Sequence, residues 1–264
     1  MIHPMPESAV ARARAFTREV VQPSVDAWEA SAVYPRDAVR DSGLTGLFVA
    51  PEDGGLGLSF PQAVAVFEEL GRGDAALAFS ISMHNAVTTA IAGVGDDALR
   101  ERWVEPLVSG KELGGFYLTE PHAGSDATAI TTRATKTGDA WAVSGTKAWV
   151  TLGGVASALL VVAKTEEEPG HRDVALFVID AADPGVHFTE PYRKAASDFL
   201  PSRTSSSTTP APISSSRRAR AWAQHSERST WPVSTSPLSR TASMPRRSTL
   251  PSGTRASAPC SGSP

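Results

Sequence analysis

The sequence contains Phe116-Tyr117-Leu118-Thr119-Glu120-Pro121-His122-Ala123-Gly124-Ser125-Asp126 and, further on, Gly145-Thr146-Lys147-Ala148-Trp149-Val150-Thr151. In the first segment, the apolar run that ends at Leu118 and Thr119 predicts a strand. Pro121 and Gly124 predict a tight turn after it, because proline fixes φ and glycine frees the backbone. Thr119, Ser125 and the N–H groups near Gly124 would then project from the end of the strand, as binding of a phosphate or a polar heterocycle requires.

The second segment places a flat aromatic residue beside a hydroxyl. Trp149 and Thr151 are two positions apart, so their side chains lie on the same face of a strand. An aromatic ring next to a hydroxyl suits a planar cofactor that forms hydrogen bonds. The alternative interpretation is a β-hairpin with a buried tryptophan and internally satisfied hydroxyls.

Together and in this order, the two segments resemble the acyl-CoA dehydrogenase family. Its flavin-binding middle domain carries Leu/Val-Thr-Glu-Pro-x-Ala-Gly-Ser-Asp and, later, Gly-x-Lys-x-Trp-Ile/Val-Thr, and both patterns are nearly intact here. The resemblance implies FAD as the cofactor, with Thr119 and Thr151 hydrogen-bonded to the flavin ring and Trp149 packed on it. It also implies that Ser125 contacts the FAD pyrophosphate region and the acyl-CoA. The full set of expected cofactor-binding residues is Phe116, Leu118, Thr119, Gly124, Ser125, Trp149, Val150 and Thr151.

The composition favours an intracellular protein. The 264 residues include one cysteine, Cys260, which excludes a disulfide framework. No apolar run approaches the ~18 residues of a membrane-spanning helix, and Met1 to Glu7 lack the pattern of a signal peptide. We therefore expect a cytoplasmic protein that uses neither a membrane nor a metal.

Two kinds of periodicity follow one another along the chain. Helical patterns run from Ser8 to Gln22 and past Pro23, from Pro35, from a Ser59–Gln62 capping box, from an Asp74 cap to about Ala92, and from Asp97 to Ser109. After Lys111, short β-rich runs occur at 116–119, 130–135, 141–144, 148–151, 158–163 and 174–179. These patterns predict an α+β chain: an all-α domain over 1–112, a small antiparallel β-sandwich or barrel that binds FAD over 113–194, and a disordered Ser/Arg/Pro-rich tail over 195–264.

One helix of the first domain carries polar residues among apolar ones. The helix expected from Ala75 to about Ala92 is apolar almost all round and therefore predicted to be buried, and His84 and Asn85 lie on it. In the family this helix borders the acyl pocket, so the resemblance makes His84 a candidate for substrate binding. The other interpretation is a hydrogen-bonded core pair, which is the commoner fate of such residues.

The tail differs from the rest of the chain in charge and composition. Residues 1–194 have a net charge of −10, whereas residues 195–264 contain nine arginines, no lysine, and only Asp198 and Glu227 as acids, for a net charge of +7. Abundant Ser, Thr and Pro with few apolar residues is typical of disorder. An Arg/Ser tail that binds nucleic acid is one interpretation, but the tail lacks repeats or interleaved aromatics, and we expect no nucleic-acid partner.

A change of reading frame explains the tail better. G/C-rich codons for residues 205–215 can be chosen so that a one-base shift yields Leu-Val-Leu-Asp-Asp-Ala-Arg-Ala-Asp-Leu-Leu, which is similar to a strand of the family's middle domain. The resemblance then implies that the α-helical domain that follows in the family is absent, and with it the catalytic Glu. The DNA sequence tests this hypothesis, which requires a family-like peptide in another frame.

The resemblance implies α,β-dehydrogenation of acyl-CoA thioesters, in which a Glu removes the α-proton as a hydride moves to the flavin. We expect no catalytic residue here, because Glu120 and Asp126 lie in the turn and Glu227 lies in the tail. An acyl-CoA dehydrogenase by ancestry, with little or no activity, is therefore predicted. Its implied partners are an acyl-CoA, an electron-transfer flavoprotein, and copies of itself in a homotetramer, which loss of the helical domain would hinder. The alternatives are a non-catalytic FAD- or acyl-CoA-binding fragment and an acyl-CoA oxidase or flavin monooxygenase of the same superfamily.

Overall fold

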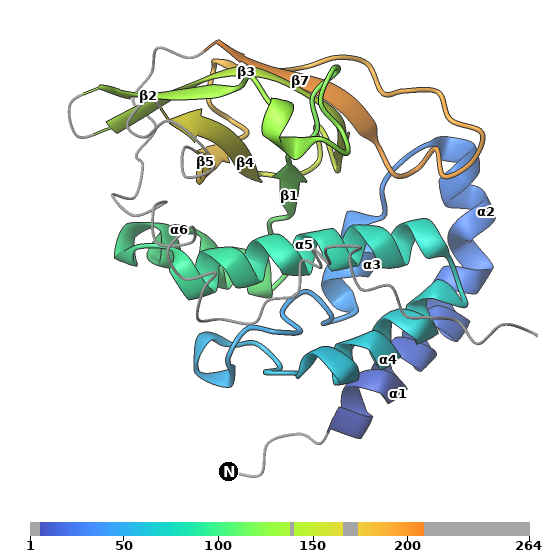
Figure 1. Cartoon of the computed structure of the whole chain (residues 1–264). Helices are drawn as coiled ribbons and strands as arrows, with labels where there is room; N and C mark the ends of the chain where they lie inside the picture. The colour runs from blue at the N-terminus through green and yellow to red at the C-terminus, as the bar shows by residue number, and fades with distance from the viewer. Residues whose placement is uncertain (1–5, 138–139, 166–173, 209–264) are drawn as a thin grey trace, which may run out of the picture. The chain divides into compact units, whose positions relative to one another are not determined.

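A computed structural model describes residues 6–137, 140–165 and 174–208. They belong to the first of two compact units, Met1–Arg228, and the second unit, Ser229–Pro264, lies outside the described residues. The described part consists of a set of helices followed by a curled β-sheet (Figure 1), which is the fold class that the sequence predicts.

The N-terminal part is helical. Its helices are α1 (Pro6–Phe16), α2 (Gln22–Ser31), α3 (Arg36–Asp41), α4 (Phe60–Gly71), α5 (Ala75–Val94) and α6 (Asp97–Val108), with a π-helical turn at Thr17–Val21 and a 3₁₀ turn at Pro51–Asp53. The π-helical turn joins α1 to α2. Pro23 is tolerated because it lies in the first turn of α2, where a missing N–H removes no essential hydrogen bond.

Polar side chains cap two helices where the sequence predicts them to. At the start of α4, Gln62 Oε1 accepts a hydrogen bond from Ser59 N at 2.8 Å. At the start of α5, Asp74 Oδ1 accepts one from Leu77 N at 2.6 Å. Asp96 caps α6 in the same way, which the sequence analysis did not anticipate. These bonds satisfy N–H groups that the first helical turn leaves without partners.

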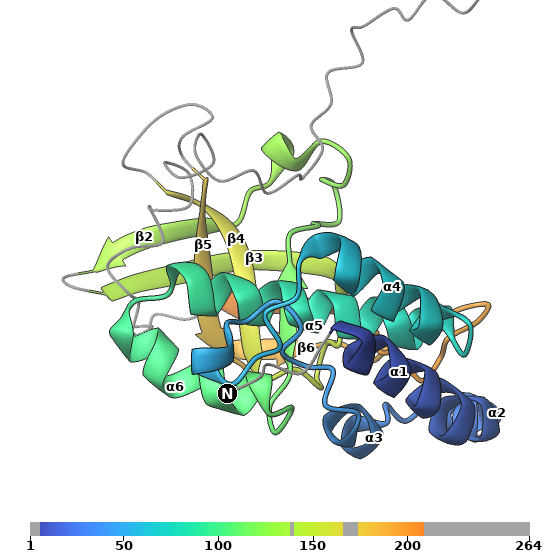
Figure 2. The ribbon, with the colours of Figure 1, turned by 90° about the horizontal axis from the view of Figure 1, so that it is seen from below.

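Helix α5 is the central element of this unit. It packs against strand β1 (Gly114–Tyr117) of the sheet on one side and against α4 on the other, with α1 beyond α4 and α6 alongside (Figures 1 and 2). Among the described residues, α5 is also the one helix long and apolar enough to cross a membrane by length and composition, so the expectation that no apolar run approaches this length is wrong. However, 56% of its most apolar window is buried inside the fold, as is typical of a core helix.

The remaining strands complete a single sheet. They are β2 (Arg133–Thr137), β3 (Ala140–Thr151), β4 (Ala158–Thr165), β5 (Val174–Asp180), β6 (Val186–Phe188) and β7 (Ser202–Thr208). The strand order is β1-β4-β2-β3-β7-β6, and β5 pairs with β4 off this path. In contrast to the all-antiparallel expectation, β4 runs parallel to both β1 and β2. Neither parallel pair is joined by a hairpin, because β2 and β3 intervene in the chain between β1 and β4, and β3 intervenes between β2 and β4.

Ordered structure continues beyond residue 194, where the sequence analysis begins the disordered tail. Phe199 and Leu200 are buried, and the Phe199 ring lies 6.3 Å from the Trp28 ring of α2. Strand β7 pairs antiparallel with β3 and with β6, although its own sequence has no apolar alternation. The strand forms because its neighbours satisfy its backbone groups on both edges. The prediction of a disordered tail is thus wrong for residues 195–208, and residues 209–264 lie outside the described part of the chain.

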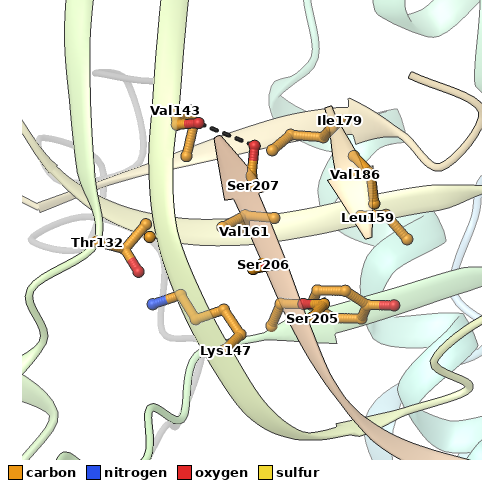
Figure 3. Close-up of a pocket in the computed structure, with 12 residues that line it drawn as sticks. Thr132, Val143, Lys147, Leu159, Val161, Ile179, Val186, Ser205, Ser206 and Ser207 are labelled. Atoms are coloured by element: carbon orange, nitrogen blue, oxygen red, sulfur yellow. Dashed lines mark hydrogen bonds between the residues drawn. The ribbon is translucent and has the colours of Figure 1, made fainter. Parts of the chain in front are cut away.

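The polar strand β7 borders a small cavity in the core of the sheet. Figure 3 shows Ser205, Ser206 and Ser207 along one side of it. The other strands contribute Tyr117, Val143, Leu159, Val161, Ile179 and Val186 to its lining. Ser205 is only 6% exposed, and the buried Tyr117 hydroxyl has no hydrogen-bond partner within the described residues. Small polar side chains therefore occupy a place suited to apolar ones, as a frame change that replaces Leu-Val-Leu by three serines would produce.

We predict that Ser205→Val increases the free energy of unfolding by about 1 kcal/mol, because it fills the cavity with buried apolar atoms. Ser202→Val is the matched control, since Ser202 lies on the same strand but is less buried and does not line the cavity. Urea denaturation monitored by circular dichroism measures both. Equal stabilisation by the two variants would show that strand propensity, and not the cavity, is responsible.

His84 joins the helices to the sheet. Its Nδ1 accepts a hydrogen bond from Gly114 N of β1 at 3.0 Å, so the proton of the neutral ring is on Nε2. Nε2 lies 3.1 Å from the carbonyl oxygens of both Thr45 and Leu107, to which it donates. The side chain is buried, and the neighbouring Asn85 amide is also fully hydrogen-bonded to backbone groups. The structure therefore favours the core interpretation of this pair.

Burial lowers the pKa of His84 from 6.5 to about 4, although the two carbonyl groups partly oppose the shift. The unfolded chain then binds more protons than the folded chain between these values, so stability is complete above about pH 6.5 and falls as the pH drops toward 4. We predict that His84→Gln lowers stability at pH 7 but flattens this decline. The exposed His187→Gln is the control and keeps the wild-type decline. Urea denaturation from pH 7.5 to 4.5 measures the slopes, and an unchanged slope in His84→Gln would contradict the assignment.

Candidate functional site

The two sequence segments that suggest a cofactor site meet in the structure. The backbone N–H of Ala148 in β3 donates a 2.8 Å hydrogen bond to the carbonyl oxygen of Thr119, just past the end of β1. Lys147 Nζ donates to the carbonyl oxygen of Leu118 at 3.0 Å. Residues about thirty positions apart in the chain are therefore direct neighbours at one edge of the sheet.

A tight turn follows β1, as predicted. Glu120 and Ala123 exchange both backbone hydrogen bonds, at 2.9 and 3.1 Å, and Pro121 and His122 form the exposed tip. Gly124 comes next, but it does not have a positive φ, and a Cβ added there would meet no atom within 4 Å. Nothing in the described residues requires glycine at this position. The close approach of a ligand to the backbone would require it.

Strand β3 is distorted where the second segment begins to face solvent. Its pairing with β7 shifts register between Lys147 and Val150. Within this bulge, Trp149 has a φ of +57° and its side chain is 62% exposed, resting against the Tyr192 ring with the centroids 4.4 Å apart. A left-handed conformation costs a non-glycine residue about 1–3 kcal/mol and clusters at ligand sites. The large exposed aromatic is thus held out of the core at an energetic cost.

Three predicted hydroxyls lie free near this bulge and the turn. Thr119 and Thr151 are half-buried, and Ser125 is exposed. Within the described ranges none of these three hydroxyls forms a hydrogen bond, so each can donate to or accept from a ligand. The structure thus links Thr119 to the Trp149 bulge through Ala148, while Ser125 follows the turn.

The other predicted residues contribute apolar packing. Phe116 and Leu118 are half-buried and pack against the buried Val162, and Val150 is fully inside the main core. For these residues only the backbone or an edge of the side chain is available to a cofactor. His84 lies in the core described above. No group of three or more His, Cys, Asp or Glu side chains gathers in the described part of the chain, and the absence of a metal stays a prediction.

The sequence predicts Glu120 only as a turn residue, but the structure gives it a buried, multiply hydrogen-bonded position. The carboxylate is buried and accepts hydrogen bonds from the N–H and hydroxyl groups of both Thr131 and Thr132, at 2.6 to 3.0 Å. It also accepts one from Lys147 Nζ at 2.8 Å. The sequence offers one signal for this contact. An acidic residue, Glu120, precedes Pro121 in the first pattern, and a basic residue, Lys147, precedes Trp149 in the second.

Glu120 is unsuited to act as a base. Burial raises the pKa of its carboxyl, but the hydrogen bonds from Lys147 and the two threonines outweigh burial and leave the pKa at about 2. A carboxylate with five donors has no free lone pair with which to remove a proton from carbon. Asp126 is exposed and caps the following 3₁₀ turn through Thr128 N at 3.1 Å.

Comparisons with known proteins agree with the sequence resemblance. The acyl-CoA dehydrogenase N-terminal domain model matches residues 6–111, and the middle domain model matches residues 115–207. Among curated relatives, the mitochondrial isobutyryl-CoA dehydrogenase of Dictyostelium discoideum is 31% identical over 71% of this chain and 46% of its own length. The glutaryl-CoA dehydrogenase of Desulfococcus multivorans is 35% identical over 66% of this chain and 46% of its own.

A solved structure shows the same arrangement. The glutaryl-CoA dehydrogenase of Mycobacterium smegmatis in complex with FADH2 superposes with a TM-score of 0.72 at 25% identity, over 81% of this chain and 55% of that one. The chain thus spans about half the length of the relatives it matches. Because adjoining family domains cover residues 6–111 and 115–207 in the family's own order, the chain belongs to the acyl-CoA dehydrogenase family.

Proposed function

We propose that this chain binds FAD and that Trp149, Thr119 and Thr151 form the surface for the flavin ring. The observation that carries the proposal is Trp149, an exposed aromatic held in a left-handed conformation near hydroxyls that have no hydrogen-bond partner among the described residues. A planar ring system stacked on the indole would repay the conformational cost. The similar glutaryl-CoA dehydrogenase whose structure contains FADH2 supports FAD as the cofactor.

The turn after β1 suits the phosphate end of the cofactor. Ser125 offers a hydroxyl, and Gly124 allows close approach of the backbone N–H groups, which favour anions. When bound, the flavin supplies a hydride acceptor, and the protein residues orient it and exclude water. By family, the proposed reaction is the α,β-dehydrogenation of acyl-CoA thioesters. FAD binding alone, without turnover, is the second candidate.

The second candidate is favoured by the carboxylates of the two segments. Glu120 is saturated with donors, and Asp126 caps a turn, so neither is placed to remove the α-proton. We propose that the described domains hold FAD and part of the acyl-CoA, and that turnover depends on a base from outside them. An electron-transfer flavoprotein as acceptor, a homotetramer and a cytoplasmic location remain proposals that rest on the family.

The visible absorption spectrum of the purified chain tests the proposal. We predict a flavin band that survives gel filtration after FAD is added, at a ratio near one FAD per chain. Bleaching of that band when butyryl-CoA or glutaryl-CoA is added without oxygen would support dehydrogenation. A stable band that does not bleach would favour the non-catalytic candidate. The absence of any retained flavin would contradict FAD binding.

The Gly124 backbone provides a variant for the same measurement. Gly124→Val places a branched side chain where only a ligand would meet it, so FAD affinity should fall at least about tenfold without loss of stability. Gly93→Val is the matched control, because Gly93 is also exposed with no atom within 4 Å of an added Cβ but lies on α5. Equal FAD affinities in the two variants would place the cofactor elsewhere.

A further inference from the structure

We propose that the buried Glu120–Lys147 ion pair is a positioning element, which locks Thr119 and Trp149 together and holds Trp149 in its exposed, left-handed conformation. The link to flavin binding rests on the proposed function, whereas the link to Trp149 does not.

The pair is enclosed almost completely. The side chains of Glu120 and Lys147 are 1% and 3% exposed, and their charged atoms lie 2.8 Å apart. Figure 3 shows the Lys147 ammonium directed toward Thr132, whose hydroxyl is a further partner of Glu120 at 2.6 Å. Buried ion pairs often add little stability compared with apolar residues of the same size, because desolvation offsets their attraction. A role in fixing geometry therefore accounts for the pair better than a role in stability.

The contacts of this pair bracket one residue of the proposed site. Lys147 Nζ bonds to the carbonyl oxygen of Leu118 and to the carboxylate of Glu120. Between them, the carbonyl oxygen of Thr119 accepts from the N–H of Ala148. Three consecutive residues of one segment are thus tied to two consecutive residues of the other, which leaves Thr119 little freedom to move relative to β3.

The same contacts determine where the strand alternation of β3 breaks. Lys147 and Ala148 are consecutive and both buried, although successive strand residues normally face opposite sides. Trp149 follows at once, with φ at +57°. Without the ion pair, Lys147 would no longer be drawn inward, and the bulge could relax to an extended strand. That relaxation would remove the backbone cost at Trp149 and move its ring away from Tyr192.

Fluorine NMR of protein labelled with 5-fluorotryptophan tests this directly. The chain has six tryptophans, and Trp149→Phe, Trp103→Phe and Trp141→Phe assign the signals of these three. We predict that Lys147→Met and Glu120→Gln shift or broaden that signal while those of the buried Trp103 and Trp141 stay in place. Lys111→Met is the control, because it removes a lysine from an exposed ion pair with Glu105. If Lys147→Met does not fold, Glu120→Gln, which keeps the side-chain shape, decides.

An unchanged Trp149 signal in a folded variant would overturn the inference and leave the pair a purely structural role. A uniform shift of all the assigned signals would also overturn it, because the effect would not be local. FAD affinity is measured in parallel for the wild type and the variants. We expect the variants to bind FAD about tenfold more weakly than the wild type, because the site is less preorganised. If the wild type binds no FAD, the proposed function fails, but the Trp149 signal still tests the positioning role.

Discussion

The structure depends on one buried contact, the ion pair between Glu120 and Lys147. The two partners come from the two segments that carry the family patterns, one just past the end of β1 and one in β3. Neither charge has access to water, so each requires the other and the surrounding donors. The geometry that satisfies them brings the turn after β1 against the bulge of β3, and the exposed edge formed by Thr119 and Trp149 follows from that contact.

A second contact places this edge relative to the helices. His84 of α5 accepts a hydrogen bond from Gly114 N at the first residue of β1, while its other nitrogen bonds to carbonyls of the helical part. Strand β1 is therefore fixed at both ends, by a neutral histidine at its start and by a charged pair just beyond its end. The position and orientation of the proposed flavin surface are thus set by buried polar contacts.

The sequence alone predicts the helices and most strands, because periodicity and caps are local signals, whereas the cofactor contacts that the two patterns imply stay predictions. It does not predict the burial of Glu120 and Lys147, since a charged side chain in a turn or strand is ordinarily exposed. Strand β7 was missed for a related reason. Its Ser, Thr and Arg residues carry no apolar alternation, and only pairing with β3 and β6 makes the strand form. The sequence leaves the role of His84 open between substrate binding and core packing, because its hydrogen-bond partners are distant in sequence.

A double-mutant cycle with Glu120→Gln, Lys147→Met and the double variant tests the central claim most directly. The quantity measured is the free energy of unfolding in urea. Each single variant leaves a buried donor or charge without its partner, so we predict losses of about 3–5 kcal/mol that are far from additive. The coupling energy should exceed about 1 kcal/mol. Additive losses, with coupling near zero, would show that the two residues act independently and that the contact does not organise the site.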